Sequence, residues 1–243
     1  MAKPQVLILQ HADWEKPGRI LECLDDVGLQ TMTMNITGQA KPDLPEFSEI
    51  AGLVIMGGPM GATDYENYPG LKKEAKLARA AISVGKPVIG VCLGQQIIAT
   101  ALGAKLTSGA VDEVGFAPIK RLSQHDYFSM WSKQLNVLHW HHDVVGLPEG
   151  AEPLARSAQT KVQAFRIGSA LAMQFHLEVS APLLEEWLAE PTMVKGMKKS
   201  QIQKIRDDFN EYNTQLQPLA DSVFSGFAAR CSTYAAYLED GRH

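Results

Sequence analysis

The stretch Pro87-Val88-Ile89-Gly90-Val91-Cys92-Leu93-Gly94-Gln95-Gln96 decides the fold and also points to a chemistry. Its first residues are apolar, which predicts a buried strand, and a helical pattern follows until Gly103 ends it. A cysteine with a glycine two residues away on each side is typical of a sharp strand-to-helix turn that carries a nucleophile. Glycine lets such a turn close without Cβ clashes, and the helix N-terminus favours a thiolate. We therefore predict that Cys92 is a catalytic nucleophile rather than a buried structural cysteine.

The sequence on the N-terminal side of this stretch repeats the same order of elements. Apolar runs at 6–9, 29–36 and 53–56 alternate with helix-like segments at 19–27 and 69–85. Strands that alternate with helices and are apolar throughout are typical of a parallel sheet covered on both faces. The fold class predicted is therefore α/β, with a mostly parallel central sheet flanked by helices.

The pattern changes on the C-terminal side of Gly103. Strands are expected at 116–122, 135–138 and 162–175, the last being a hairpin that turns at Gly168-Ser169, and the sequence is helical from Ala181 to the end. A basic cluster in that helical part is interpreted as a solvated helix face rather than a partner surface: Lys195, Lys198, Lys199, Lys204 and Arg206. We found no repeat or linker. The prediction is one domain over residues 1–243, with a catalytic core at about 5–180 and a helical C-terminal extension at about 181–243.

Charge and cysteine content exclude several classes of function. The net charge of −4 gives no basic excess for binding nucleic acid or an anionic membrane. No apolar segment is long enough for a signal-peptide core or a membrane span, so a cytoplasmic location is expected. Cys23, Cys92 and Cys231 are too far apart for a CxxC metal motif and too few for a disulfide framework.

A thiol nucleophile requires an imidazole base, and the best candidate is His176 in Gln174-Phe175-His176-Leu177-Glu178. It follows an apolar strand, so it can emerge at that strand's end. Side chains two residues apart in an extended segment point the same way, which lets Glu178 accept a hydrogen bond from the far nitrogen of His176. We therefore predict a Cys92–His176–Glu178 triad.

The competing histidines lie in Leu138-His139-Trp140-His141-His142-Asp143. Such a cluster suggests zinc, but His139 and His141 offer only an alternating pair, with no cysteine or second cluster nearby. The prediction is therefore no metal and no cofactor.

Backbone donors for a negatively charged oxygen are expected in Met56-Gly57-Gly58-Pro59-Met60-Gly61, which follows a strand. The predicted pair is the N–H of Gly58 and the N–H of Leu93, the residue after the nucleophile. A phosphate loop is disfavoured because neither GxxxxGK[ST] nor GxGxxG is present.

Together these three motifs resemble the class I glutamine amidotransferases, and more narrowly their stand-alone, GMP-synthase-like branch. The resemblance covers about residues 5–180 and implies a flavodoxin-like three-layer sandwich. It further implies that Cys92 attacks the γ-carboxamide of glutamine, that ammonia leaves from a γ-glutamyl thioester, and that His176, oriented by Glu178, moves the protons.

The same resemblance implies a set of residues for the amino-acid end of the substrate. The Gln96 side chain and backbone groups of 140–143, including Trp140, His142 and Asp143, would contact that end, and Glu113 would line the pocket. Two positions depart from the family pattern. The usual His-Pro-Glu is His176-Leu177-Glu178 here, and the His-Gly-Asp of GMP synthases is His141-His142-Asp143, which adds a side chain near the substrate.

Three further hypotheses remain open from the sequence. A family member normally delivers ammonia to a synthase, so a separate synthase subunit is an expected partner beside the small-molecule substrate. Alternatively, the chain acts as a γ-glutamyl peptidase on other γ-glutamyl amides. A non-catalytic regulatory protein on the same fold is disfavoured because nucleophile, base and orienting acid are all present. An α/β-hydrolase is disfavoured because its acid normally precedes the histidine.

Overall fold

The computed structural model describes residues 3–124 and 126–241, in which nine strands form one sheet in the order β2-β1-β3-β4-β11-β10-β9-β6-β7. The strands of this sheet are β1 (Gln5–Leu9), β2 (Gln30–Met34), β3 (Ile50–Ile55), β4 (Val88–Val91), β6 (Glu113–Arg121), β7 (Gln134–His141), β9 (Glu152–Arg156), β10 (Ala164–Ile167) and β11 (Ala170–Met173). The short strands β5 (Leu106–Thr107) and β8 (Val144–Val145) pair separately. The helices are α1 (Arg19–Asp26), α2 (Leu71–Ser83), α3 (Leu93–Ala101), α4 (Ala181–Ala189) and α5 (Lys199–Glu239), with single 3₁₀ turns η1 (Phe47–Glu49) and η2 (Asp126–Phe128).

The α/β class predicted from the sequence is confirmed, and the sheet is mixed. Strands β2, β1, β3, β4 and β11 are parallel neighbours, whereas β11, β10, β9, β6 and β7 pair antiparallel. The expectation of a mostly parallel sheet therefore holds for the half built by the first hundred residues. The second half is antiparallel because hairpins replace helical crossovers there, as at the predicted turn Gly168-Ser169, where Gly168 adopts φ 54°.

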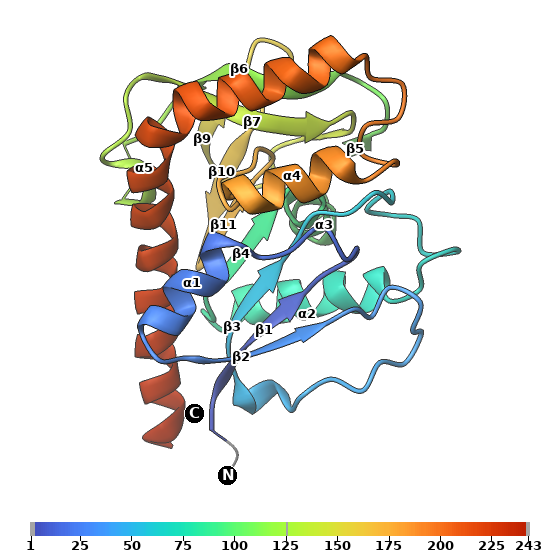
Figure 1. Cartoon of the computed structure of the whole chain (residues 1–243). Coiled ribbons are helices and arrows are strands. Elements are labelled where there is room, and N and C mark those ends of the chain that lie inside the picture. The colour runs from blue at the N-terminus through green and yellow to red at the C-terminus, as the bar shows by residue number, and fades with distance from the viewer. Residues whose placement is uncertain (1–2, 125, 242–243) are drawn as a thin grey trace.

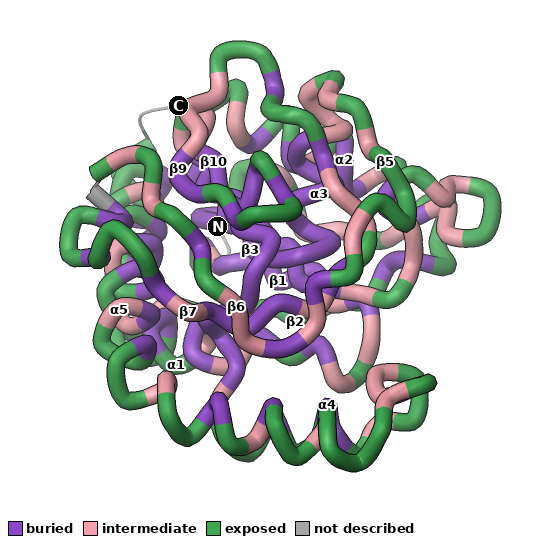
Figure 2. The backbone as a smooth tube through the Cα atoms, turned by 90° about the horizontal axis from the view of Figure 1, so that it is seen from above, coloured by how far each residue is buried: buried purple, intermediate pink, exposed green. Residues whose placement is uncertain are grey.

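The parallel half is covered by helices on both faces, and alternate residues of each strand supply the two cores (Figure 1). On β1, Val6 and Ile8 belong to a cluster with residues of α1 and α5, whereas Leu7 and Leu9 belong to a cluster with residues of α2 and α3. Figure 2 shows the central strands β1 and β3 as buried, while loops at the rim are exposed. The three-layer arrangement thus follows from strands that are apolar on both sides.

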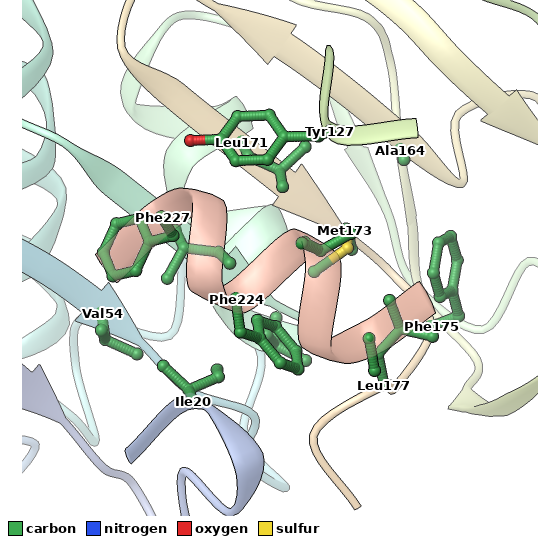
Figure 3. Packing of buried hydrophobic residues seen from close by; sticks show 14 of the residues in the cluster. Ile20, Val54, Tyr127, Ala164, Leu171, Met173, Phe175, Leu177, Phe224 and Phe227 are labelled. Carbon is green, nitrogen blue, oxygen red and sulfur yellow. The ribbon is translucent and has the colours of Figure 1, made fainter. Parts of the chain in front are cut away.

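The C-terminal helix α5 is 41 residues long and confirms the helical signal after Ala181. Figure 1 shows two arms joined by a sharp bend, and the helix contains Pro218, which lacks the N–H of a regular helical turn. The second arm packs Phe224 and Phe227 into the core beside Ile20 and Val54 (Figure 3). None of the helices in residues 3–124 and 126–241 is both long and apolar enough to cross a membrane.

Candidate active site

Three adjacent parallel strands, β3, β4 and β11, bring the predicted motifs to one edge of the sheet. Gly57-Gly58 follows β3, Cys92 follows β4, and His176 follows β11. Carboxyl ends of parallel strands meet at the same edge, where open α/β sheets place their binding sites. Segments that are far apart in sequence therefore border one cavity of about 420 Å³.

Cys92 has the strained backbone expected of a nucleophile at such a turn. Its φ is 53° and its ψ −105°, and it is the one non-glycine residue with positive φ in the described chain. Its N–H donates to the carbonyl of Met173 at 2.8 Å, and its thiol lies 3.7 Å from the carbonyl of Trp140. Strain of this kind persists only where neighbouring contacts enforce it.

The flanking glycines explain why the turn can close. A Cβ on Gly94 would lie 2.0 Å from the carbonyl oxygen of Ile55, and one on Gly90 would lie 2.7 Å from the carbonyl oxygen of Gly94. Strand β3, strand β4 and helix α3 therefore approach one another at a distance that excludes any side chain at these two positions.

We expect Gly94→Ala to lower the free energy of unfolding by about 3 kcal/mol, because the new methyl group meets backbone rather than a flexible side chain. Gly38→Ala is the matched control, since nothing lies within 4 Å of a Cβ there, and it should change stability by less than about 0.5 kcal/mol. Chemical denaturation of the two variants measures both values. Equal stability of the two would contradict the close approach at Gly94.

His176 and Glu178 form a buried, short contact. Nδ1 of His176 lies 2.6 Å from Oε1 of Glu178, and both side chains are 1% exposed or less. Nε2 of His176 is buried, has no conventional partner in the described chain, and is coupled to the thiol of Cys92. This is the geometry of a base whose far nitrogen is held by a carboxylate, as predicted from the i, i+2 spacing.

The charge state of His176 is set by opposing effects. Burial disfavours the imidazolium, but the Glu178 carboxylate and then Cys92 outweigh it, so the pKa of His176 is raised well above its ordinary value. Trp187 of α4 packs edge-on against the imidazole at 4.8 Å between ring centroids and donates its N–H to the carbonyl of Trp14 at 2.7 Å. Sequence analysis did not identify Trp187, because nothing in its local pattern distinguishes it from a core aromatic.

Leu177, which stands where the family usually has proline, has a specific use. Its N–H donates to Oε2 of Glu178 at 3.0 Å, a bond that proline could not make. Its side chain is buried in the core beside α1 and α5. The second carboxylate oxygen is therefore fixed by the backbone of the very residue that departs from the family pattern.

Gly58 and Leu93 border the cavity together with Cys92, so the predicted donors lie at the right place. Neither N–H has a hydrogen-bond partner within residues 3–124 and 126–241. The turn after β3 is anchored by His11, whose Nδ1 donates to the carbonyl of Gly57 at 2.9 Å and whose Nε2 lies 2.8 Å from Glu74. Burial opposes the charged form of His11, yet Glu74 dominates and its pKa is raised.

The residues expected at the amino-acid end also line the cavity, but they are tied down to different degrees. Gln96 donates to Oε1 of Gln174 at 3.1 Å and more weakly to the carbonyl of Asp143 at 3.4 Å. The Asp143 carboxylate accepts from the N–H of Gly109 at 2.8 Å, so its backbone rather than its carboxylate is free to face a ligand. The His142 side chain is 61% exposed at the rim, and the carbonyl of Trp140 faces the thiol.

The segment between α4 and α5 contributes Thr192, Met193 and Lys195 to this wall. Sequence analysis placed Lys195 in a solvated basic cluster. Its position over the cavity depends on where α4 ends and α5 begins, which residue spacing does not specify. An adjoining cavity of about 480 Å³ shares Trp140, His142, Met193 and Lys195 with the first.

Glu113, His139 and His141 form a buried group whose donor atoms lie within 4.8 Å of one another and could hold a metal ion. The carboxylate is already held by Thr160 and by Gln163 Nε2 at 2.9 Å, and His141 Nε2 lies 3.2 Å away. Burial would raise the pKa of Glu113, but these donors lower it to about 2. Its charge is thus satisfied by protein groups, and Glu113, predicted to line the pocket, lies behind His141.

This geometry agrees with what comparison to known proteins finds. A family model described as glutamine amidotransferase class-I matches residues 18–190, well over half of the chain. The chain belongs to this family.

Relatives within the class I glutamine amidotransferases include a glutamine amidotransferase-like protein, YfeJ, of Salmonella typhimurium. It is 31% identical over 189 residues, covering 74% of this chain and 78% of that protein. A component chain of the glutamine-hydrolysing GMP synthase of Methanococcus aeolicus is 30% identical over 141 residues, 57% of this chain and 70% of that one. The chain spans only 23% of one GMP synthase that it also matches. The crystal structure of a glutamine amidotransferase from Thermotoga maritima superposes with a TM-score of 0.84 at 27% identity, covering 94% of this chain and 99% of that one.

Proposed function

We propose that this class I amidotransferase hydrolyses the γ-carboxamide of glutamine through a γ-glutamyl thioester on Cys92, releasing ammonia and glutamate. The observation that carries the proposal is the convergence of a strained Cys92 and the His176–Glu178 pair, 2.6 Å apart, at the ends of adjacent strands β4 and β11. Nucleophile, base and orienting acid then stand in the roles that acyl transfer needs.

In the first half-reaction the Cys92 sulfur bonds to the amide carbon, and the carbonyl electrons move to oxygen. The N–H groups of Gly58 and Leu93 stabilise that oxyanion. The C–N bond then breaks as the imidazolium of His176 gives its proton to the departing nitrogen. Glu178 keeps Nδ1 protonated, so the exchange with sulfur and nitrogen passes through Nε2.

In the second half-reaction His176 removes a proton from water, which attacks the thioester carbon. The carbon–sulfur bond breaks, glutamate forms, and the thiolate–imidazolium pair is restored. Hydroxylamine intercepts a thioester of this kind, so γ-glutamyl hydroxamate should form at the expense of glutamate when it is present.

The amino-acid end of glutamine is proposed to lie against Gln96 and the backbone of 140–143. Lys195 supplies a cation at that wall, suited to the α-carboxylate. We expect Lys195→Ala to raise KM for glutamine about 10-fold with little change in kcat, because the contact is equal in ground and transition states.

Steady-state kinetics measure this effect, and Lys72→Ala on the exposed face of α2 is a matched control that should alter neither constant. A fall in kcat at unchanged KM would contradict a role for Lys195 in ground-state binding.

A second candidate, γ-glutamyl peptidase activity, is favoured by the adjoining cavities, which together offer more room than glutamine fills. The chemistry is the same and only the leaving amine differs. Incubation of the pure protein with glutamine and with γ-glutamyl peptides, followed by assays for ammonia, amine and glutamate, separates the two. Failure to turn over either substrate, with the fold intact, contradicts both.

A partner is also part of the proposal, because one relative is named as a component chain of a GMP synthase. A separate synthase subunit would accept the ammonia in place of water. Co-purification of such a synthase with this chain, and glutaminase activity that rises on binding, are the expected results.

A further inference from the structure

Glu15, between β1 and α1, is a buried acid inside the candidate site. It is only 5% exposed and borders the same cavity as Cys92, Gly58 and Leu93. Its Oε2 has no hydrogen-bond partner in the described part of the chain. A buried polar atom without a partner is costly, and in a binding cavity it marks a place where a ligand atom belongs.

The carboxyl group is held in a defined place. It lies so close to the turn after β3 that a Cβ on Gly57 would be 2.4 Å from Oε2 of Glu15. Gly57 is therefore glycine because Glu15 occupies the space that a side chain would take. Sequence analysis interpreted this glycine only as part of a loop with free N–H groups.

The groups that act electrostatically on Glu15 come from both sides of the site. Burial raises its pKa to about 7, while His176 opposes this effect, Glu178 adds to it and His11 opposes it. Glu15 thus lies within range of the base that must exchange a proton with the substrate, and its carboxylate is populated near neutral pH.

The remaining walls of the cavity assign a direction. Gln96 and residues 140–143 are on the side proposed for the amino-acid end, and Gly58 and Leu93 receive the carbonyl oxygen. The departing nitrogen must face His176, which leaves it on the side between His176 and the Gly57 turn, where Glu15 lies.

We propose that Glu15 accepts a hydrogen bond from the departing nitrogen and so makes the site selective for amides over esters, an inference that rests on the proposed glutamine hydrolysis. As the C–N bond breaks, its electron pair stays on nitrogen, which takes the proton of His176. The nitrogen gains partial positive charge during this transfer, and the carboxylate of Glu15 stabilises it through an N–H of the amide. Glu15 neither gains nor loses a proton.

The test compares glutamine with glutamate γ-methyl ester, whose leaving group carries no N–H. For Glu15→Gln we expect kcat/KM to fall about 10- to 100-fold for the amide and to change less than about 3-fold for the ester. Labelling of Cys92 by 6-diazo-5-oxonorleucine, which has a diazomethyl group in place of the amide nitrogen, should keep its wild-type rate and shows that the site is intact. Glu22→Gln, an exposed glutamate on α1, should alter neither substrate.

An equal fall for amide and ester, or no fall for either, would overturn the role of Glu15. Should the glutamine variant not fold, Glu15→Asp retains the charge but withdraws it by one methylene, and the amide-to-ester ratio should fall in the same direction. Wild-type protein that neither hydrolyses the two substrates nor is labelled at Cys92 overturns the proposed function itself, a result distinct from a selective or unselective Glu15 variant.

Discussion

Cys92→Ala is expected to abolish ammonia release from glutamine, by at least about 10⁴-fold, while the free energy of unfolding changes by less than about 1 kcal/mol. The activity is lost because no other thiol of the described chain borders the cavity beside His176. Stability is retained because the thiol faces the cavity and its contact with the Trp140 carbonyl is long, at 3.7 Å. Ammonia release and chemical denaturation measure the two quantities.

The other cysteines provide matched controls with the opposite behaviour. Cys231 is fully buried in α5, where burial raises the pKa of its thiol, and it lies against Gly52. Cys231→Ala should cost about 1 kcal/mol of stability and leave turnover unchanged, and Cys23→Ala should leave turnover unchanged as well. Stoichiometric labelling by a glutamine-analogue electrophile at Cys23 or Cys231 would refute the assignment of Cys92.

The sequence was sufficient for the features that depend on local pattern. The strand–turn–helix at Cys92 and the i, i+2 pair of His176 and Glu178 are encoded within a few residues, so their geometry could be predicted from spacing. The meeting of Gly58 with these groups also followed, because parallel strands place their carboxyl ends together.

What the sequence could not indicate depends on contacts between distant segments. Glu15 and Trp187 reach the site only because the loop after β1 and helix α4 fold over it, and neither lies in a recognisable motif. Strand β9 was missed because Glu152-Pro153 weakens its apolar pattern, yet pairing with β10 and β6 makes it a strand. Tertiary pairing overrides propensity most readily in short strands.

Glu178→Gln is expected to lower kcat/KM for glutamine about 10³- to 10⁴-fold, although the substitution preserves shape. The two oxygens of Glu178 have different partners: Oε1 faces Nδ1 of His176 at 2.6 Å, and Oε2 accepts from the N–H of Leu177 at 3.0 Å. The Leu177 N–H requires an acceptor, so the glutamine will turn its oxygen there and its NH₂ toward His176. That NH₂ donates to Nδ1 and forces the proton of neutral His176 onto Nε2, where it prevents the ring from accepting a proton from Cys92.

The pair Glu178→Gln and Glu185→Gln separates this effect from a general loss of charge. Glu185 lies on α4, is exposed, and bonds to Arg206 at the surface, so its substitution should leave kcat/KM unchanged. The loss for Glu178→Gln should appear at every pH, because a wrong tautomer is not corrected by titration, whereas the loss of the carboxylate alone would lower the pKa of His176 and shift the profile. A Glu178→Gln enzyme that regains wild-type turnover at a displaced pH would therefore assign Glu178 an electrostatic role and remove its role in fixing the tautomer.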